Sequence, residues 1–283
     1  MLGISRQVYY RRKASVRQRQ QKAYKVISLV SQVRQKMPRI GTRKLHYLLN
    51  EPLKELKVGR DKLFSILKAN HMIIYPKRSY HITTNSHHRF YKHKNLISEI
   101  VPTRPEQIWV SDITYIGKRN NNTYLALVTD AYSKKIMGYD VSNSLSAQGS
   151  INALKMALNK RIYNDEPLIH HSDRGIQYCC DEYQDVIDKN QLICSMTETY
   201  DPYANAVAER INGILKDEFS IEEYNLSIEN MKLLIKESIE IYNTIRPHYS
   251  CYMYTPNEMH KQRKISIRTY KIKKSFQASL ETL

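Results

Sequence analysis

The segment Ile108-Trp-Val-Ser-Asp-Ile-Thr-Tyr-Ile116 decides the fold class of this 283-residue chain. Two further β-rich stretches follow it at 123–129 and 135–141, and polar turn residues separate the three stretches. Short runs of β-branched and aromatic residues bounded by Gly, Asn, Asp and Ser are typical of strands. We therefore predict three successive strands that form an antiparallel meander.

Helical and β-rich stretches alternate beyond the meander. The apolar spacing predicts three helices and two strands in turn, at about 147–161, 168–171, 181–189, 191–196 and 204–219. A long amphipathic helix then begins after Ser227, a suitable N-cap, and reaches about Ile245. The order βββαβαβα predicts an α/β fold: a mixed five-stranded sheet with flanking helices.

The first hundred residues are helical and basic in character. A helix is expected from Ser15 to about Lys36, and two shorter helices are expected to begin at Gly41 and Gly59. Two short helices separated by a loop in a basic segment favour a small all-α, helix-turn-helix-like domain. Arg60 and Lys62 of the last helix are then placed to contact DNA phosphates.

These patterns divide the chain into four regions. A basic helical region is expected at 1–75, a linker at 76–104, an α/β core domain at 105–260 and a basic C-terminal tail at 261–283. The linker carries Tyr, His, Lys and Pro without periodicity, which is typical of a connecting segment.

The net charge of +18 is distributed unevenly along the chain. Residues 1–100 carry 23 Lys and Arg against 4 Asp and Glu, whereas residues 101–260 carry 15 against 22. The last 23 residues are basic again. Two basic ends around an acidic middle indicate a polyanion-binding protein whose central carboxylates have a separate task. Basic solvated tails without a ligand are the alternative.

Neither a membrane span nor a secretory signal is expected. The chain has no run of about 18 apolar residues and no apolar stretch near Met1, so we expect a cytoplasmic protein without a membrane partner. Its four cysteines, at 179, 180, 194 and 251, include no Cys-x-x-Cys pair and are expected to be reduced.

Two acids stand at positions where chemistry is plausible. Asp112 lies in the middle of the first β-rich stretch, where burying a carboxylate is costly unless it has a partner. Asp173 directly follows the strand that ends in His170-His171, and strand ends are where α/β sheets commonly assemble sites. Taken alone, each acid has an equally good structural explanation.

A third acid, Glu209, belongs to the helix at about 204–219. On that helix Asn205, Glu209, Asn212 and Lys216 recur at spacings of 4, 3 and 4, which gives a polar stripe. Metal-dependent polynucleotide chemistry needs carboxylates that hold two divalent cations about 3.5–4 Å apart. Asp112, Asp173 and Glu209 are the candidate catalytic and metal-binding residues, although such a stripe is also typical of a solvated helix face.

The spacing of these acids, with 35 residues between Asp173 and Glu209, resembles the D,D(35)E signature of the retroviral-integrase and transposase superfamily. Several sequence motifs around these acids are similar to motifs of bacterial insertion-sequence transposases encoded by the second of two reading frames. They are His171-Ser-Asp-Arg-Gly-Ile-Gln-Tyr178, Asp201-Pro-Tyr-Ala-Asn-Ala-Val-Ala-Glu-Arg210, Tyr242-Asn-Thr-Ile-Arg-Pro-His248 and Thr255-Pro256. The resemblance extends over about residues 1–260.

This resemblance implies a ribonuclease-H-like catalytic core that acts on double-stranded DNA. It implies two Mg²⁺ or Mn²⁺ ions held by the three carboxylates, strand cleavage by water, and attack of the freed 3′-OH on another phosphodiester. It also implies that Lys216, seven positions after Glu209, lies near the DNA end. Partners implied by the family are a second copy of the chain in a homo-oligomer on DNA and a companion first-frame protein, in the bacterial nucleoid.

Some assignments remain open at this level. Relatives often carry an acid where this chain has Ala204, which puts one local contact in doubt. Arg246 and His248 match a family motif and serve either DNA binding or helix packing. A nuclease or junction resolvase of the same fold is the first alternative function. A DNA-binding regulator without catalysis is the second.

Overall fold

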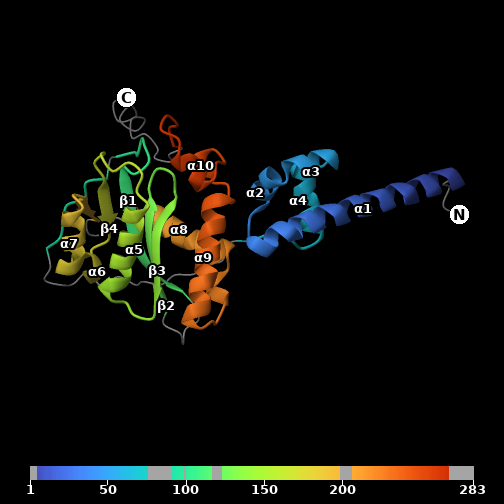
Figure 1. The fold of residues 1–283 in the computed structure, drawn as a ribbon. Coiled ribbons are helices and arrows are strands. Elements are labelled where there is room, and N and C mark those ends of the chain that lie inside the picture. The colour runs from blue at the N-terminus through green and yellow to red at the C-terminus, as the bar shows by residue number, and fades with distance from the viewer. Residues whose placement is uncertain (1–4, 76–90, 99, 117–122, 198–205, 268–283) are drawn as a thin grey trace, which may run out of the picture.

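A computed structural model describes residues 5–75, 91–98, 100–116, 123–197 and 206–267 (Figure 1). Within these residues, a five-stranded sheet has the order β3-β2-β1-β4-β5. The strands are β1 (Ile108–Ile116), β2 (Thr123–Asp130), β3 (Ile136–Ser142), β4 (Ile169–Ser172) and β5 (Ile193–Met196). β1, β2 and β3 pair antiparallel, whereas β4 is parallel to β1 and β5 is parallel to β4. The predicted mixed, ribonuclease-H-like sheet and its meander are confirmed.

Helices cover both faces of the sheet because its strands alternate their apolar side chains. Leu125 and Leu127 of β2 belong to the cluster that packs against α8 and α9, whereas Ala126 and Val128 belong to the cluster on the opposite face, against α5 and α7. The helices of this domain are α5 (Ala147–Asn159), α6 (Ile176–Cys179), α7 (Asp181–Lys189), α8 (Ala206–Glu218), α9 (Ile228–Thr244) and α10 (Pro256–His260), with single 3₁₀ turns at Ile221–Glu223 and Tyr249–Cys251.

One glycine allows α5 to approach β3 closely. A Cβ atom at Gly138 would lie 2.0 Å from the backbone oxygen of Ala153 and 2.7 Å from the backbone nitrogen of Ala157. No side chain fits in that space. The absence of a side chain at Gly138 therefore sets the distance between the helix layer and the sheet.

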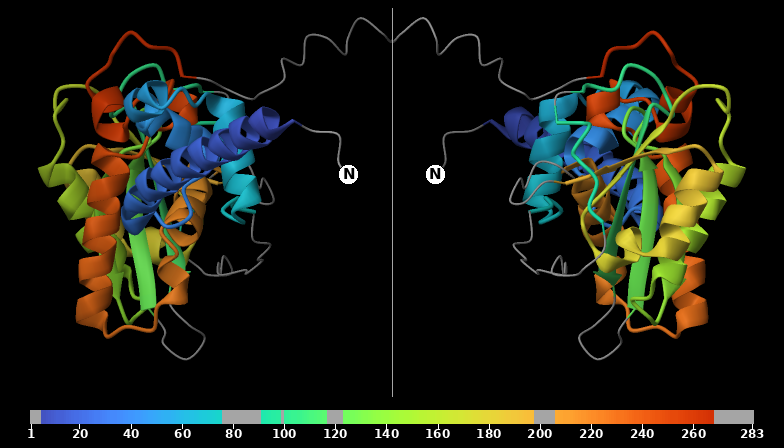
Figure 2. Two further views of the ribbon diagram at one scale, coloured as in Figure 1. Left: turned by 90° about the vertical axis from the view of Figure 1, so that its right-hand side faces the viewer. Right: turned by 90° about the vertical axis from the view of Figure 1, so that its left-hand side faces the viewer.

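The N-terminal helices form a unit at one side of the sheet domain, and α1 extends outward from it (Figure 1). The left view of Figure 2 places this unit between the viewer and the sheet. Its helices are α1 (Arg6–Lys36), α2 (Thr42–Leu48), α3 (Asn50–Glu55) and α4 (Arg60–Ala69). One apolar cluster contains Val30 and Leu45 of this unit together with Leu215 of α8, so the two parts share a core.

Two helical boundaries differ from the sequence-based expectation. α1 begins nine residues earlier than predicted, because the Ser5 side chain caps it by accepting a hydrogen bond from the Val8 amide. The predicted loop between the two short helices contains a further helix, α3. Pro52 is compatible with this helix because residues of the first turn need no backbone N–H donor.

The later half of the predicted linker lies against the sheet domain. The Met196 amide of β5 donates to the Lys94 carbonyl oxygen at 3.2 Å, and the Leu96 amide donates to Ser195 Oγ at 2.9 Å. Ile97 packs beside Val110 of β1. Residues 94–97 therefore follow the edge of β5, while the four predicted regions and their boundaries remain predictions.

The start of the predicted C-terminal tail also contacts the core. Helix α10 was not predicted. Thr255 and Glu258 form a capping box at its start, and the spacing Thr-x-x-Glu is typical of such a helix start. The Tyr132 hydroxyl donates to the Ile265 carbonyl oxygen at 2.7 Å, and Ile265 and Ile267 pack against Tyr132 and Met259. In the described part of the chain, none of the helices is long and apolar enough to cross a bilayer.

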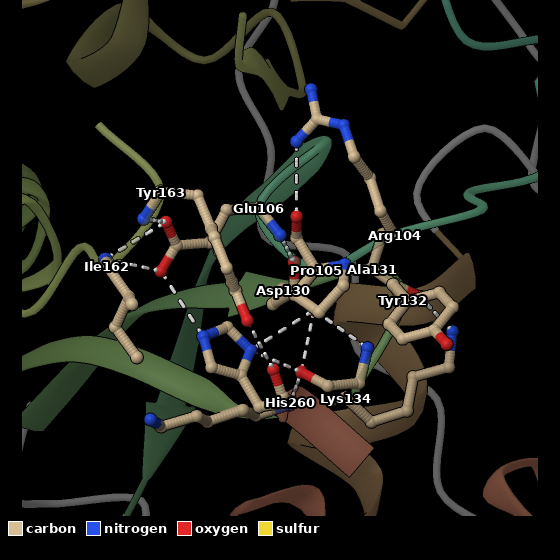
Figure 3. Close-up of polar contacts among 12 residues, drawn as sticks. Arg104, Pro105, Glu106, Asp130, Ala131, Tyr132, Lys134, Ile162, Tyr163 and His260 are labelled. Atoms are coloured by element: carbon tan, nitrogen blue, oxygen red, sulfur yellow. Dashed lines mark hydrogen bonds and ion pairs between the residues drawn. The ribbon is translucent and has the colours of Figure 1, made fainter. Parts of the chain in front are cut away.

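A buried polar cluster joins α10 to the sheet domain (Figure 3). The His260 ring lies between two carboxylates: Nε2 is 3.2 Å from Oε1 of Glu106, and Nδ1 is 3.7 Å from Oδ2 of Asp130. Nδ1 also lies 3.0 Å from Ser133 Oγ. The series Ser133, His260 and Glu106 resembles the nucleophile, base and acid of a hydrolase. Ser133 and Glu106 are fully buried, however, so a substrate cannot reach them and the cluster is structural.

Candidate active site

Two of the predicted acids lie side by side because of the strand register. Val110 of β1 pairs with His171 of β4, and these strands are parallel. Continuing the same register by two residues places Asp112 level with Asp173, which directly follows β4. The Asp173 carboxylate also accepts a hydrogen bond of 2.9 Å from the Gly175 amide, which shapes the turn after the strand. The pairing of β1 with β4 thus brings together two acids that are 61 residues apart.

Helix α8 brings the polar stripe to the same place. Asn212 Nδ2 donates a hydrogen bond of 2.7 Å to Oδ2 of Asp112, across 100 residues of sequence. Asn212 is 5% exposed, so this part of the stripe is not a solvated face. Glu209 lies one turn earlier on the same side of α8 and is exposed. The remaining predicted member of the stripe, Asn205, lies outside the described residues.

The charges of the three acids interact with one another. Burial raises the pKa of Asp112 to about 7, the nearby charges of Asp173 and Glu209 raise it as well, and the Asn212 hydrogen bond opposes them. Glu209, although exposed, is partly covered by its neighbours, and this partial burial raises its pKa as well. Negative charges that raise the pKa of Asp112 indicate a place where a cation is favourable.

The donor groups of this site fit a hard divalent cation. Carboxylate oxygens are the ligands that Mg²⁺ and Mn²⁺ prefer. Oδ1 of Asn212 is buried without a hydrogen-bond partner among the described residues, which leaves an unused oxygen beside Asp112. Within the described residues, however, no three His, Cys, Asp or Glu side chains are yet gathered closely enough to surround an ion. Binding of one ion by all three carboxylates would require them to lie closer together.

The histidine before the second acid has a structural position. His171 is fully buried, and its Nδ1 lies 2.9 Å from Ser195 Oγ on the adjacent strand β5. A histidine beside a candidate catalytic acid can serve either proton transfer or a structural hydrogen bond. Its burial and its bond across the sheet favour the structural role.

Lys216 lies near the site but is paired within the chain. Its Nζ is 2.8 Å from Oε1 of Glu222, and its side chain is 20% exposed. A DNA phosphate that contacts Lys216 has to compete with this ion pair. Contact of Lys216 with DNA therefore remains a prediction.

Arg246 and His248, for which the sequence left DNA binding and helix packing open, are both buried. Arg246 is 1% exposed and holds Glu218 with two hydrogen bonds of 2.8 Å, from Nε to Oε2 and from Nη2 to Oε1. His248 is 8% exposed, and its Nδ1 lies 2.9 Å from Ser250 Oγ. Because both side chains are buried and engaged, the geometry supports the packing role that the sequence had left open.

Residues of the Tyr242–His248 motif connect the end of α9 to β3 and to the turn before it. The Tyr242 hydroxyl donates to the Lys134 carbonyl oxygen at 2.8 Å. The Asn243 side-chain amide bonds both the N–H and the C=O of Ile136 at 3.0 Å, which satisfies backbone groups of the edge strand β3. These structural roles were not predicted, although a dense polar segment directly after an amphipathic helix was a signal.

The predicted phosphate-contacting residues of the N-terminal domain are exposed. Arg60 pairs with the adjacent Asp61, at 2.9 Å from Nε to Oδ1. Lys62 lines a groove of about 960 Å³ between α1 and α4. Further cations that were not predicted to bind phosphate line the same groove, three of them on the basic helix α1 and one between α3 and α4: Arg19, Lys22, Lys25 and Lys57.

The fold and the arrangement of acids define an integrase-type catalytic core. A family model described as integrase core domain matches residues 102–202, and a second model with the same description matches residues 190–256. Together the two models cover more than half of the chain. The chain belongs to the integrase core domain family, which comprises DDE-type polynucleotidyl transferases.

The chain is similar to proteins of bacterial insertion elements and to a solved integrase structure. The insertion element IS600 uncharacterized 31 kDa protein of Shigella sonnei is 34% identical over 254 residues, which cover 88% of this chain and 92% of that protein. Transposase InsF for insertion sequence IS3fB, from Escherichia coli strain K12, is 36% identical over 161 residues, which cover 56% of this chain and 55% of that protein. A structure of the HTLV-2 integrase catalytic core domain in complex with magnesium has 20% identity and a TM-score of 0.44, and covers 56% of this chain and 97% of that one.

Proposed function

We propose that this protein is the transposase of a bacterial insertion sequence, and that it cleaves DNA and transfers the cleaved strand. The observation that carries the proposal is the meeting of Asp112, Asp173 and the Glu209–Asn212 side of α8 beside β1, the central strand of the sheet. The relatives named for insertion elements support the same activity.

Asp112, Asp173 and Glu209 would hold two Mg²⁺ or Mn²⁺ ions in this proposal. When bound, such ions activate a nucleophilic oxygen and stabilise the charge that develops on the leaving oxygen. Asn212 orients the Asp112 carboxylate through its hydrogen bond of 2.7 Å. The Gly175 amide orients Asp173 in the same way, so two of the three acids have a fixed supporting bond.

The N-terminal domain is the proposed DNA-binding part. The groove between α1 and α4 is lined by five Lys and Arg side chains and by no acid. For Lys22, Lys25 and Lys62, no carboxylate lies within ion-pair distance in the described part of the chain. Cations without internal partners are available to phosphates, and their contacts with the backbone of double-stranded DNA are independent of base sequence.

The wider assembly follows from the same proposal. We infer that two or more copies act together on DNA, that a companion first-frame protein takes part, and that the protein works in the bacterial cytoplasm at the nucleoid. The proposed division is a DNA-binding region at 1–75, a linker at 76–104, a catalytic core at 105–260 and a basic tail at 261–283.

The test of this function is a strand-transfer assay. The full chain is incubated with Mn²⁺ and a labelled duplex that carries the ends of its element, beside Asp112→Asn and Glu209→Gln. Glu237→Gln, at an exposed position on α9, is the matched control. We expect joining by the wild type and the control, and loss of joining in both site variants. Undiminished joining by either site variant contradicts the three-carboxylate mechanism, and cleavage without joining by the wild type favours a nuclease.

A further inference from the structure

Glu218, the last residue of α8, is the meeting point of three parts of the chain. Arg246, which follows α9, binds its carboxylate with two parallel hydrogen bonds of 2.8 Å. Lys44 of α2 binds the same carboxylate, with Nζ 2.5 Å from Oε1. Glu218 therefore joins α8 to the N-terminal domain through Lys44 and to the Tyr242–His248 motif through Arg246.

The carboxylate is charged and tightly held at this junction. Burial alone would raise the pKa of Glu218, but the hydrogen bonds and charges of Arg246 and Lys44 outweigh it and lower the pKa to about 2. The side chains of Glu218 and Lys44 are 14% and 17% exposed. An ion pair shielded from solvent in this way has a defined geometry, unlike a surface pair.

A backbone bond reinforces the contact between the two domains. The Arg39 amide, in the loop between α1 and α2, donates to the Glu218 carbonyl oxygen at 3.0 Å. Around this point the apolar cluster that contains Val30 and Leu45 continues into Phe219. The N-terminal domain is thus attached to the C-terminal end of α8 by polar and apolar contacts together.

The other end of the same helix carries the catalytic site. Glu209 lies nine residues before Glu218, which is about 14 Å along a helix. Asn212 lies between them and holds Asp112. A helix of this length transmits a displacement of one end to the other because its backbone hydrogen bonds keep it rigid.

We propose that Glu218 is a positioning residue that couples the N-terminal DNA-binding domain to the catalytic helix α8 through its ion pair with Lys44. Arg246 also binds Glu218 through both carboxylate oxygens, so replacing Lys44 by an uncharged residue leaves the buried carboxylate paired. The inference rests on the proposed strand-transfer function. It adds that the Lys44–Glu218 ion pair fixes the position and orientation of the DNA-binding domain relative to Glu209 and Asn212.

The experiment compares Lys44→Met, Lys44→Arg and the control Lys54→Met in the full chain. Lys54 lies on α3 of the same domain and forms a surface pair with Glu51. Small-angle X-ray scattering measures the relative placement of the domains, and fluorescence anisotropy measures DNA affinity. Strand transfer is then measured at saturating DNA. Should Lys44→Met fail to fold, Lys44→Gln is measured in its place.

We expect Lys44→Met to broaden the scattering distance distribution and to slow strand transfer by roughly tenfold to a hundredfold, the effect of a misplaced catalytic group. DNA affinity should stay within about twofold, because the groove cations are untouched, and Lys44→Arg should restore both rate and shape. Unchanged scattering and an unchanged rate in Lys44→Met would overturn the proposal. If the wild type joins no DNA, the proposed function fails, while scattering still decides whether Lys44 joins the domains.

Discussion

Asn212 Nδ2 donates a hydrogen bond of 2.7 Å to Oδ2 of Asp112 and so joins helix α8 to β1, the central strand of the sheet. The donor lowers the pKa of a carboxyl group that burial and two neighbouring acids raise. Oδ1 of the same amide has no partner among the described residues. Asn212 is therefore placed both to orient Asp112 and to offer a further oxygen beside it.

Replacing Asn212 tests this relationship. In Asn212→Ala we expect weaker Mn²⁺ binding and slower strand transfer, because Asp112 loses its orienting bond and becomes harder to ionise. The loss of activity should be roughly tenfold to a hundredfold, as for other supporting contacts of metal ligands. Calorimetric Mn²⁺ titration measures the binding. Equal Mn²⁺ affinity in the variant and the wild type would refute the role.

The raised pKa of Asp112, about 7, has two measurable consequences. Metal binding needs the ionised carboxylate, so Mn²⁺ affinity should rise with pH up to about 7 and then level off. In the metal-free protein, Asp112 keeps its proton up to about pH 7 in the folded state, whereas it loses the proton near pH 3.8 in the unfolded state. The free energy of unfolding therefore falls as pH rises through that window.

Asp112→Asn removes that penalty. The variant should therefore melt at a higher temperature than the metal-free wild type at pH 8, and the difference should be clearly smaller at pH 5 because most of the window lies above that pH. Differential scanning calorimetry in a chelating buffer makes the comparison. A variant that melts lower than the wild type at pH 8 would show that Asp112 stabilises the empty site instead.

His260 makes a second pH-dependent contribution. Burial lowers its pKa, but its hydrogen bonds to Asp130 and Glu106 outweigh burial, so the pKa lies above the ordinary 6.5. Lys135, Arg161 and the two carboxylates are the charged groups that face this cluster. A raised pKa adds stability that is fully present below pH 6.5 and is lost as pH rises through the folded-state value.

Urea unfolding at pH 6 and pH 9 checks this expectation. Wild type should lose more stability between the two values than His260→Gln, which has no titrating ring. His71→Asn, at an exposed position with positive φ, is the control and should follow the wild type. An equal loss in His260→Gln and wild type would contradict the assigned charge on His260.

Two glycines should respond in opposite directions to the same substitution. Gly138→Ala should destabilise the fold by roughly 2 kcal/mol or more, because a Cβ there overlaps the backbone of α5. Gly213→Ala should stabilise it by about 0.5–1 kcal/mol, since a helical Cβ there meets no atom within 4 Å. Chemical denaturation measures both. A neutral Gly138→Ala would mean that α5 shifts freely on the sheet.

The groove between α1 and α4 predicts a salt effect. Replacing Lys25 and Lys62 together by Ala should reduce the slope of log affinity against log salt by about two, because each phosphate contact contributes about 0.9. Lys54→Ala, outside the groove, is the control and should leave the slope unchanged. Anisotropy with a generic duplex in a metal-free buffer gives the slopes. The same slope in the double variant would place the DNA elsewhere.

Local patterns predicted most of the fold because they depend on neighbouring residues. The bounds of β1 (Ile108–Ile116) and α7 (Asp181–Lys189) agree with the prediction, and Ser227 caps α9 by accepting from the Asn230 amide. Helices α3 and α10 were missed because each is only five or six residues long. Short helices carry too few apolar repeats for periodicity to detect them.

The sequence by itself determined the order of strands and helices, the two basic ends and the identity of the three candidate acids. Its motifs also determined the family to which the chain belongs. These properties follow from residue type and spacing, which need no knowledge of distant contacts.

Tertiary structure alone decided which of the polar residues work together. Asp112 meets Asp173 through the pairing of β1 with β4, and it meets Asn212 because α8 packs against β1. The same folding buried Arg246 against Glu218, where sequence had left a DNA contact equally open. Partners that are 28 to 100 residues apart are chosen by packing and burial, and a local pattern carries no information about either.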